Sequence, residues 1–485
     1  MNVTSVSAIQ SVGGDTGPSG DIAISADQVL ISGQNEFSRS RIETVSGGQA
    51  ETGKITLNVR ELVVTDGGRI NTENTVSGSR LGGIHIIATE SLTVSDEGKI
   101  RMENLAGPAG PIAIDAPTIT LDQGIIQTES LSGNAGSVTL HADNLTLAGG
   151  FINTKVTQDV PGRGGDVTIN VTDTVSLSGQ FNGNVVGDNP RPAGIYADTA
   201  GTLQGGDISV TAGNLVFLSG AGAGLFSQSL GSSGDGGAIS VQAPQIQLSD
   251  SAMISAKSTG SGNAGTITVE GTASPAQSVL IDGPGSGIFT DTQGTGAGGN
   301  IFVDANTVTL QNGGTLSAST SGTNNGGDIQ VDATAINLLS FAFISALSSL
   351  DVSAGNAGNI ALKATQQITA VDAFLNTDTV GGTGRGGDIL LRAPTISVNG
   401  GVLSTSTSGE GRAGNILLEG QQISLGASPF AGAQGADLFA VTSGSGHGGA
   451  FTLRGLEGPS SHADNVTISG TSRIHTLTGS NGSAG

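Results

Sequence analysis

The sequence predicts an all-β fold, a right-handed parallel β-helix of about 15 coils with roughly 30 residues and three short strands per coil. Fifteen times, a glycine stands two residues before an aliphatic residue or Phe, and a second aliphatic residue follows two positions later. Apolar and polar residues alternate around each of these anchors, and Gly/Asn/Asp turns follow at a constant phase. A fixed period between 20 and 50 residues is the signature of a solenoid. The anchors are Ile22, Ile55, Ile84, Ile112, Val138, Val167, Ile208, Ile239, Ile267, Ile301, Ile329, Ile360, Ile389, Ile416 and Phe451.

The first strand of each coil begins at the anchor. In the coil that starts at Gly53, Ile55 and Leu57 alternate with the polar Thr56. Successive side chains of a strand point to opposite faces, so the anchor and the residue two positions later are expected in buried stacks. We expect the glycine before the anchor often to have a positive φ.

The second and third strands follow at fixed distances. The second recurs seven or eight residues after the anchor, as at Leu62 and Leu92, and the third follows a turn that is often a double glycine, such as Gly149-Gly150. One coil cannot bury its apolar face alone, whereas stacked coils can.

Composition limits the possible functions. The repeat spans nearly all 485 residues, which predicts a single domain, 1–485, with longer loop insertions at about 180–205 and 426–448. The net charge of −22 and the lack of a Lys/Arg stripe exclude a nucleic-acid partner. Without cysteine there is neither a disulfide nor thiol catalysis. There is no apolar run of membrane-spanning length and no visible signal peptide.

Both ends of the chain lie inside a predicted third strand and its return loop (7–14 and 473–476), so both look truncated within a repeat. Open coils expose unpaired strand edges, which solenoids normally cap. We therefore expect possible end-to-end self-association through aliphatic residues of the terminal coils, namely Val6, Ile9, Ile468 and Ile474.

The repeat resembles that of filamentous-haemagglutinin-type exoproteins, the surface adhesins of two-partner secretion systems in Gram-negative bacteria and cyanobacteria. The lines that carry the resemblance are GNAGSVTLHADNLTLAGGFINTKV from Gly133, GGDVTINVTDTVSLSG from Gly164 and GGDILLRAPTISVNGGVLSTSTSGEGRAGNILLEG from Gly386. It implies a β-helical shaft at the outer cell surface or secreted, an outer-membrane transporter as partner, and contact with a host or neighbouring-cell surface or glycan. The family's N-terminal secretion domain has no counterpart here, and the only Asn-Pro pair is Asn189-Pro190.

One candidate site is the column of residues that directly precede the anchors. A cation ladder is one interpretation, and turns closed by side-chain bonds to the backbone, with stacked amides, are the other. We favour the structural interpretation. On five successive coils the column contains Asn300, Asp328, Asn359, Asp388 and Asn415.

A second candidate site is a column on the third strands, formed by Glu73, Glu103, Glu129 and then Lys155. Stacked carboxylates can perturb one another's pKa and perform acid/base chemistry, as in polysaccharide-cleaving β-helices. However, Arg69, Lys99 and Arg101 share that face, and no aromatic platform for sugar rings is evident. We therefore expect a solvated face, with surface contact as the weaker alternative.

The insertions are the third candidate, since insertions in repeats map to loops that often bind partners. They contain Tyr196, Phe430 and Phe439. No motif predicts a cofactor, a metal site or a catalytic residue. The sequence thus favours a non-enzymatic structural or adhesive shaft, with a polysaccharide lyase or glycoside hydrolase on a parallel β-helix as the alternative.

Overall fold

The computed structural model describes residues 1–14, 17–35, 38–48, 50–74, 81–105, 107–182, 191–273, 275–349, 354–430 and 434–479. Over these ranges it is all-β, without a helix, and forms a parallel β-solenoid of about 14 turns with a period of ~29 residues and three parallel sheets. The predicted fold class is confirmed. The chain divides into two compact units, Met1–Val241 and Gln242–Gly485. No described helix is long and apolar enough to cross a membrane.

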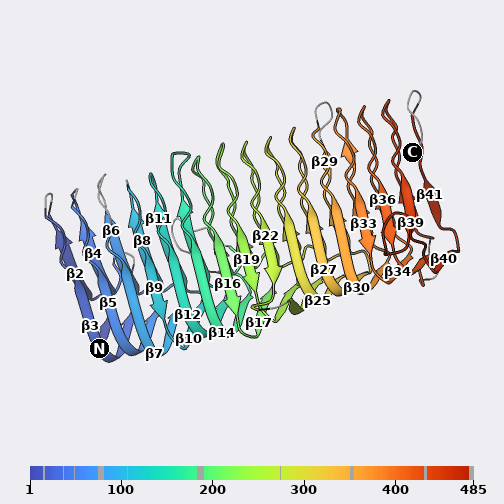
Figure 1. The fold of residues 1–485 in the computed structure, drawn as a ribbon. Coiled ribbons are helices and arrows are strands. Elements are labelled where there is room, and N and C mark those ends of the chain that lie inside the picture. The colour runs from blue at the N-terminus through green and yellow to red at the C-terminus, as the bar shows by residue number, and fades with distance from the viewer. Residues whose placement is uncertain are drawn as a thin grey trace. The chain divides into compact units, whose positions relative to one another are not determined.

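In the first unit, sheet A holds the first and second strands of each coil, which in several coils merge into one long strand (Figure 1). Its strands are β1 (Asn2–Thr4), β3 (Ile22–Ser32), β5 (Ile55–Thr65), β7 (Ile84–Ser95), β9 (Ile112–Asp115), β10 (Thr118–Asp122), β12 (Val138–Ala148), β14 (Val167–Ser178), β16 (Ile208–Ala212) and β17 (Leu215–Ser219). Sheet B holds the third strands, β2 (Ala8–Gly13), β4 (Arg41–Ser46), β6 (Arg69–Asn74), β8 (Lys99–Asn104), β11 (Ile125–Ser130), β13 (Phe151–Val156), β15 (Gly194–Tyr196) and β18 (Gly224–Phe226). The unit boundary falls within β19 (Ile239–Gln242).

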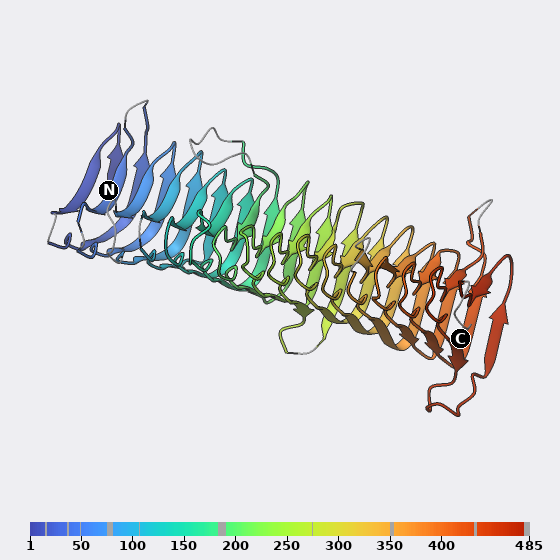
Figure 2. The ribbon, with the colours of Figure 1, turned by 90° about the horizontal axis from the view of Figure 1, so that it is seen from above.

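The second unit repeats this arrangement (Figure 2). Sheet A contains β20 (Gln245–Ser249), β22 (Ile267–Glu270), β23 (Ala276–Asp282), β25 (Ile301–Gln311), β27 (Ile329–Leu339), β30 (Ile360–Val371), β33 (Ile389–Arg392), β34 (Thr395–Asn399), β36 (Ile416–Glu419), β37 (Gln422–Gly426), β39 (Phe451–Arg454) and β40 (Asn465–Ile468). Sheet B contains β21 (Met253–Ser255), β24 (Gly287–Phe289), β26 (Thr315–Ser317), β28 (Phe343–Ser345), β31 (Phe374–Asn376), β35 (Val402–Ser404), β38 (Asp437–Phe439) and β41 (Arg473–His475). A small third sheet pairs β29 (Ser348–Ser349) with β32 (Thr379–Val380).

The anchors form the core because the register of sheet A places each directly over the next. Ile55 pairs with Ile84, and Ile84 pairs with Ile112. From Ile55 to Leu418, each anchor and the residue two positions later are at most 2% exposed. Ile22 and Phe451, in the outermost of these strands, are half-buried. Burial of the anchors is thus confirmed.

The glycine two residues before each anchor is required by close packing. The prediction that it often has a positive φ is wrong, since none of the described positive-φ glycines occupies that position. A Cβ at Gly165 would overlap with the carbonyl oxygen of Gly136, its counterpart one coil earlier, and Gly414 stands in the same way over Gly387. The coils therefore approach so closely there that no side chain fits.

A buried hydroxyl from sheet B binds the carbonyl of these glycines. Thr44 Oγ1 donates to the oxygen of Gly53 at 3.1 Å, and Thr405 Oγ1 donates to the oxygen of Gly414 at 2.8 Å. Thr44 lies in β4 and Thr405 directly follows β35, so the bond joins the sheet B side of a coil to the glycine that precedes its next sheet A strand.

Positive φ angles occur instead at the turn between the second and third strands. Asp66 and Gly67 have φ of 49° and 70°, and Asn312 and Gly313 have 52° and 89°.

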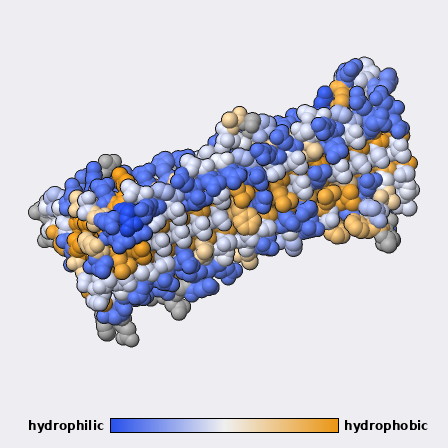
Figure 3. All heavy atoms as spheres, turned by 90° about the horizontal axis from the view of Figure 1, so that it is seen from below, coloured by the Kyte–Doolittle hydropathy of each residue, from blue (hydrophilic) through white to orange (hydrophobic). Residues whose placement is uncertain are grey.

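On the face drawn in Figure 3, hydrophobic residues form separate patches among hydrophilic ones.

Candidate functional site

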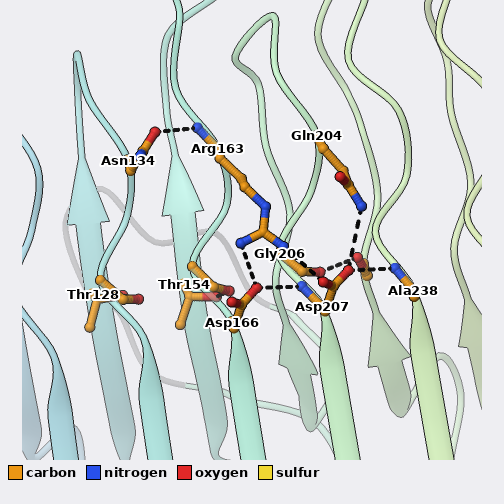
Figure 4. A network of polar contacts seen from close by, with 12 residues as sticks. Thr128, Asn134, Thr154, Arg163, Asp166, Gln204, Gly206, Asp207 and Ala238 are labelled. Carbon is orange, nitrogen blue, oxygen red and sulfur yellow. Dashed lines mark hydrogen bonds and ion pairs between the residues drawn. The ribbon is translucent and has the colours of Figure 1, made fainter.

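The column before the anchors ties successive coils together in the first unit (Figure 4). Asp166 Oδ1 accepts a hydrogen bond from the amide of Asp207 at 2.9 Å, and Asp207 Oδ1 accepts one from Ala238 at 2.8 Å. A similar bond lies three residues before the column positions of two successive coils, where Asn134 Oδ1 accepts a hydrogen bond from the amide of Arg163 at 3.0 Å. The Arg163 guanidinium pairs with Asp166 and Asp207, each at 2.8 Å.

The same bonds run through the second unit. The side chain of Asn300 accepts from the amide of Asp328, that of Asp328 from Asn359, that of Asn359 from Asp388, and that of Asp388 from Asn415, at 2.7–2.9 Å. These side-chain bonds to the backbone fit the structural interpretation, although they join neighbouring coils and do not close a turn within one coil. Over the described residues, no three His, Asp or Glu side chains are grouped as a metal site would need.

The acidic column of the first unit lies in one register on sheet B. Glu73 pairs with Glu103, Glu103 with Glu129, and Glu129 with Lys155. Arg101 contacts Glu103 at 2.5 Å and Glu129 at 3.6 Å, and Lys155 lies 3.6 Å from Glu129. Arg101 and Lys155 therefore compensate the charges of Glu103 and Glu129 in this column.

The expectation of an ordinary solvated face is wrong for this row. The side chains of Glu103 and Glu129 are only 18% and 12% exposed, and Lys99 is buried. Burial raises the pKa of Glu103, and the neighbouring Glu129 and Glu73 add to the effect, while Arg101 opposes it. Burial, together with Arg39 and Arg101, lowers the pKa of Arg69 to about 10.

Tyr196 lies in strand β15 and not in the predicted surface loop. Its ring is 7% exposed, stacks on Phe226 with centroids 4.9 Å apart, and lies under the Arg191 guanidinium at 4.6 Å. Its hydroxyl donates to the carbonyl of Pro192 at 2.8 Å. The ring thus fastens one end of the insertion to sheet B. Asn189 and Pro190 lie outside the described residues.

Phe439 is likewise a strand residue, at the end of β38, and its ring stacks on His475 at 5.1 Å. Phe430 does lie in a loop, after β37, and is 59% exposed. Of the three aromatic candidates, only Phe430 projects from the surface in the manner expected.

Phe430 lines a cleft of about 510 Å³ that sequence reasoning did not find. Phe341 and Phe374 also line it, with their rings 6.5 Å apart and inclined by 14°. Two carboxylates, Asp372 and Asp437, lie at the same cleft. An aromatic platform therefore exists, but in the second unit and far in sequence from the acidic column.

Phe341 occupies a left-handed turn position that holds Gly67, Glu97, Ser251 or Gly313 in other coils. Its φ is 67° and its side chain is 65% exposed. The register of β25 and β27 places Phe341 opposite Gly313 of the preceding coil, since Gln311 pairs with Leu339. An aromatic residue in the left-handed region is an outlier that is often associated with function. A Phe at this turn position was the available sequence signal.

Comparisons with protein-family models, with curated proteins and with solved structures found no match. The parallel β-solenoid is consistent with a β-helical shaft, and the resemblance to filamentous-haemagglutinin-type exoproteins stays a prediction.

Proposed function

We propose that the chain is a non-enzymatic structural and adhesive shaft of a secreted or cell-surface exoprotein, exported through an outer-membrane transporter and in contact with a cell surface or glycan. The observation that carries the proposal is the uniform core, with the same two positions of each coil at most 2% exposed from Ile55 to Leu418. Buried residues that stack from coil to coil make the solenoid a stiff support, and its exposed loops and turns are available to contact a surface.

The charge-compensated acidic row supports the non-enzymatic part of the proposal. A glycosidase needs one protonated carboxyl and one free carboxylate at a defined separation across the substrate. Arg101 instead bridges Glu103 and Glu129, and Lys155 also pairs with Glu129. Arg101 opposes the burial that raises the pKa of Glu103, and both carboxylates are held in ion pairs.

The test combines adhesion with turnover. Beads coated with the purified chain should be retained on bacterial cell layers or on immobilised polysaccharides more than beads coated with an unrelated acidic protein. The same preparation should release no reducing ends and no unsaturated products from those polysaccharides. Turnover that vanishes in Glu103→Gln would establish the lyase or hydrolase alternative, and retention no greater than the control would refute the adhesive role.

A further inference from the structure

The cleft of the second unit combines aromatic walls with negative charge. We propose that it binds a quaternary ammonium group, of the trimethylammonium class, carried by a small soluble molecule. The inference concerns this cleft alone and does not depend on the adhesive role of the chain.

The aromatic residues supply the first part of the argument. Phe341 and Phe374 have nearly parallel rings, with centroids 6.5 Å apart and planes inclined by 14°, and Phe430 from the loop after β37 lines the same cavity. A cation within about 6 Å of a ring centroid is attracted by the negative face of the π-system, and more strongly where water is excluded. The volume of about 510 Å³ leaves room for a cation larger than ammonium.

The charges supply the second part. Both oxygens of Asp437 accept from the Arg473 guanidinium, at 2.9 and 2.7 Å, so that carboxylate is neutralised. Asp372 Oδ2 accepts only the Ser428 hydroxyl, at 2.7 Å, and over the described residues no cation pairs with Asp372. The cleft thus carries one uncompensated negative charge, on a chain whose net charge of −22 already attracts cations.

The hydrogen-bonding state of these carboxylates favours a quaternary cation over a primary ammonium or a sugar. A primary ammonium or a sugar brings several N–H or O–H donors that lose water and need acceptors. Three of the four oxygens of Asp372 and Asp437 already hold a donor. A quaternary ammonium has no donor, so it needs only the charge and the ring faces.

The backbone at Phe341 supplies independent support. A large aromatic side chain stands in the left-handed region and remains mostly exposed, whereas the preceding coil has Gly313 at the equivalent position. A bulky, mostly exposed ring at a left-handed turn that other coils fill with Gly313 or Ser251 points to a function.

The experiment is calorimetric titration of the full chain with tetramethylammonium and with choline. The comparison ligands are 3,3-dimethylbutan-1-ol, which is the neutral isostere of choline, and glucose. Both cations should bind to a single site, and the neutral isostere at least about tenfold more weakly. Phe341→Gly should weaken cation binding by about tenfold and Asp372→Asn by several-fold. Phe341→Gly introduces the residue of the preceding coil and is therefore expected to fold.

Phe302→Leu is the matched control. It alters a partly exposed Phe on sheet A of the same unit and should leave the affinity unchanged. Equal affinity for the neutral isostere, glucose binding that depends on Phe341, or full cation binding by Phe341→Gly would each overturn the proposal. So would the absence of binding by both cations. Because these titrations measure no adhesion, they fail or succeed separately from the bead assay.

Discussion

Replacing Gly165 with alanine tests the explanation given for the repeated glycines. The added methyl group would overlap with the carbonyl oxygen of Gly136 in the coil before it. Overpacking of this kind costs about 1–3 kcal/mol. The shift needed to relieve it also strains the bond from the Thr154 hydroxyl to the Gly165 carbonyl, worth about 0.5–1.5 kcal/mol. Alanine also restricts the conformations of the unfolded chain, which offsets the loss of folding free energy by about 0.4–1 kcal/mol. The net expectation is a destabilisation of about 0.5–4 kcal/mol.

The measurement is thermal and urea-induced unfolding followed by the far-ultraviolet β signal. Gly47→Ala is the matched control in the same unit, because nothing lies within 4 Å of a Cβ at Gly47 and its φ is not positive. The control should lie within about 1 kcal/mol of the wild type. If Gly165→Ala were as stable as Gly47→Ala, close approach of the coils would not be the reason for glycine at this position.

Three further predictions concern the core, a buried acid and the terminal coils. Ile329→Asp places a carboxylate in the stack between Ile301 and Ile360 and removes about 1.5–3 kcal/mol of hydrophobic stabilisation. Amide hydrogen exchange should therefore accelerate in those coils but not in distant ones. Burial raises the pKa of Asp198 from 3.8 to about 6, so ionisation destabilises the fold as the pH rises through that window. Asp198→Asn should therefore be more stable than wild type by up to about 3 kcal/mol at pH 7 and equal to it below pH 4, whereas an equal difference at both pH values would contradict this. Exposed Ile468 and Ile474 should promote end-to-end association once salt shortens the Debye length to about 8 Å, and strictly monomeric sedimentation at both low and moderate salt would refute it.

The sequence was sufficient to predict the coils because two periodicities coincide in it. Period-two alternation gave the strand faces, and the recurrence of the anchors gave their register, so Ile55, Ile84 and Ile112 could be placed in one stack. The conformation of the glycines could not be predicted, since glycine is equally suited to a positive φ and to a close approach. The structure shows the second cause before the anchors and the first cause at the later turn.

The candidate sites were only partly predictable. The alignment of Glu73, Glu103 and Glu129 followed from the repeat, but their burial depends on the length of neighbouring side chains. Tyr196 was assigned to a loop because the insertion hides where the next third strand begins. The cleft was missed because Phe341, Phe374 and Phe430 come from three separate segments, which only the stacking brings together.

The bonds of the Asn/Asp column have a consequence for how the chain can change length. From Asn300 to Asn415, each coil offers a side-chain acceptor to the coil after it, which supplies a backbone donor at the same position. Any of these coils is thus an acceptable neighbour for any other of them. Duplication or loss of one of these coils leaves every such bond able to re-form, whereas a change of a few residues inside a strand displaces donor from acceptor. Evolution and protein engineering can therefore lengthen or shorten the stack by whole coils, while shorter insertions are tolerated only in the loops.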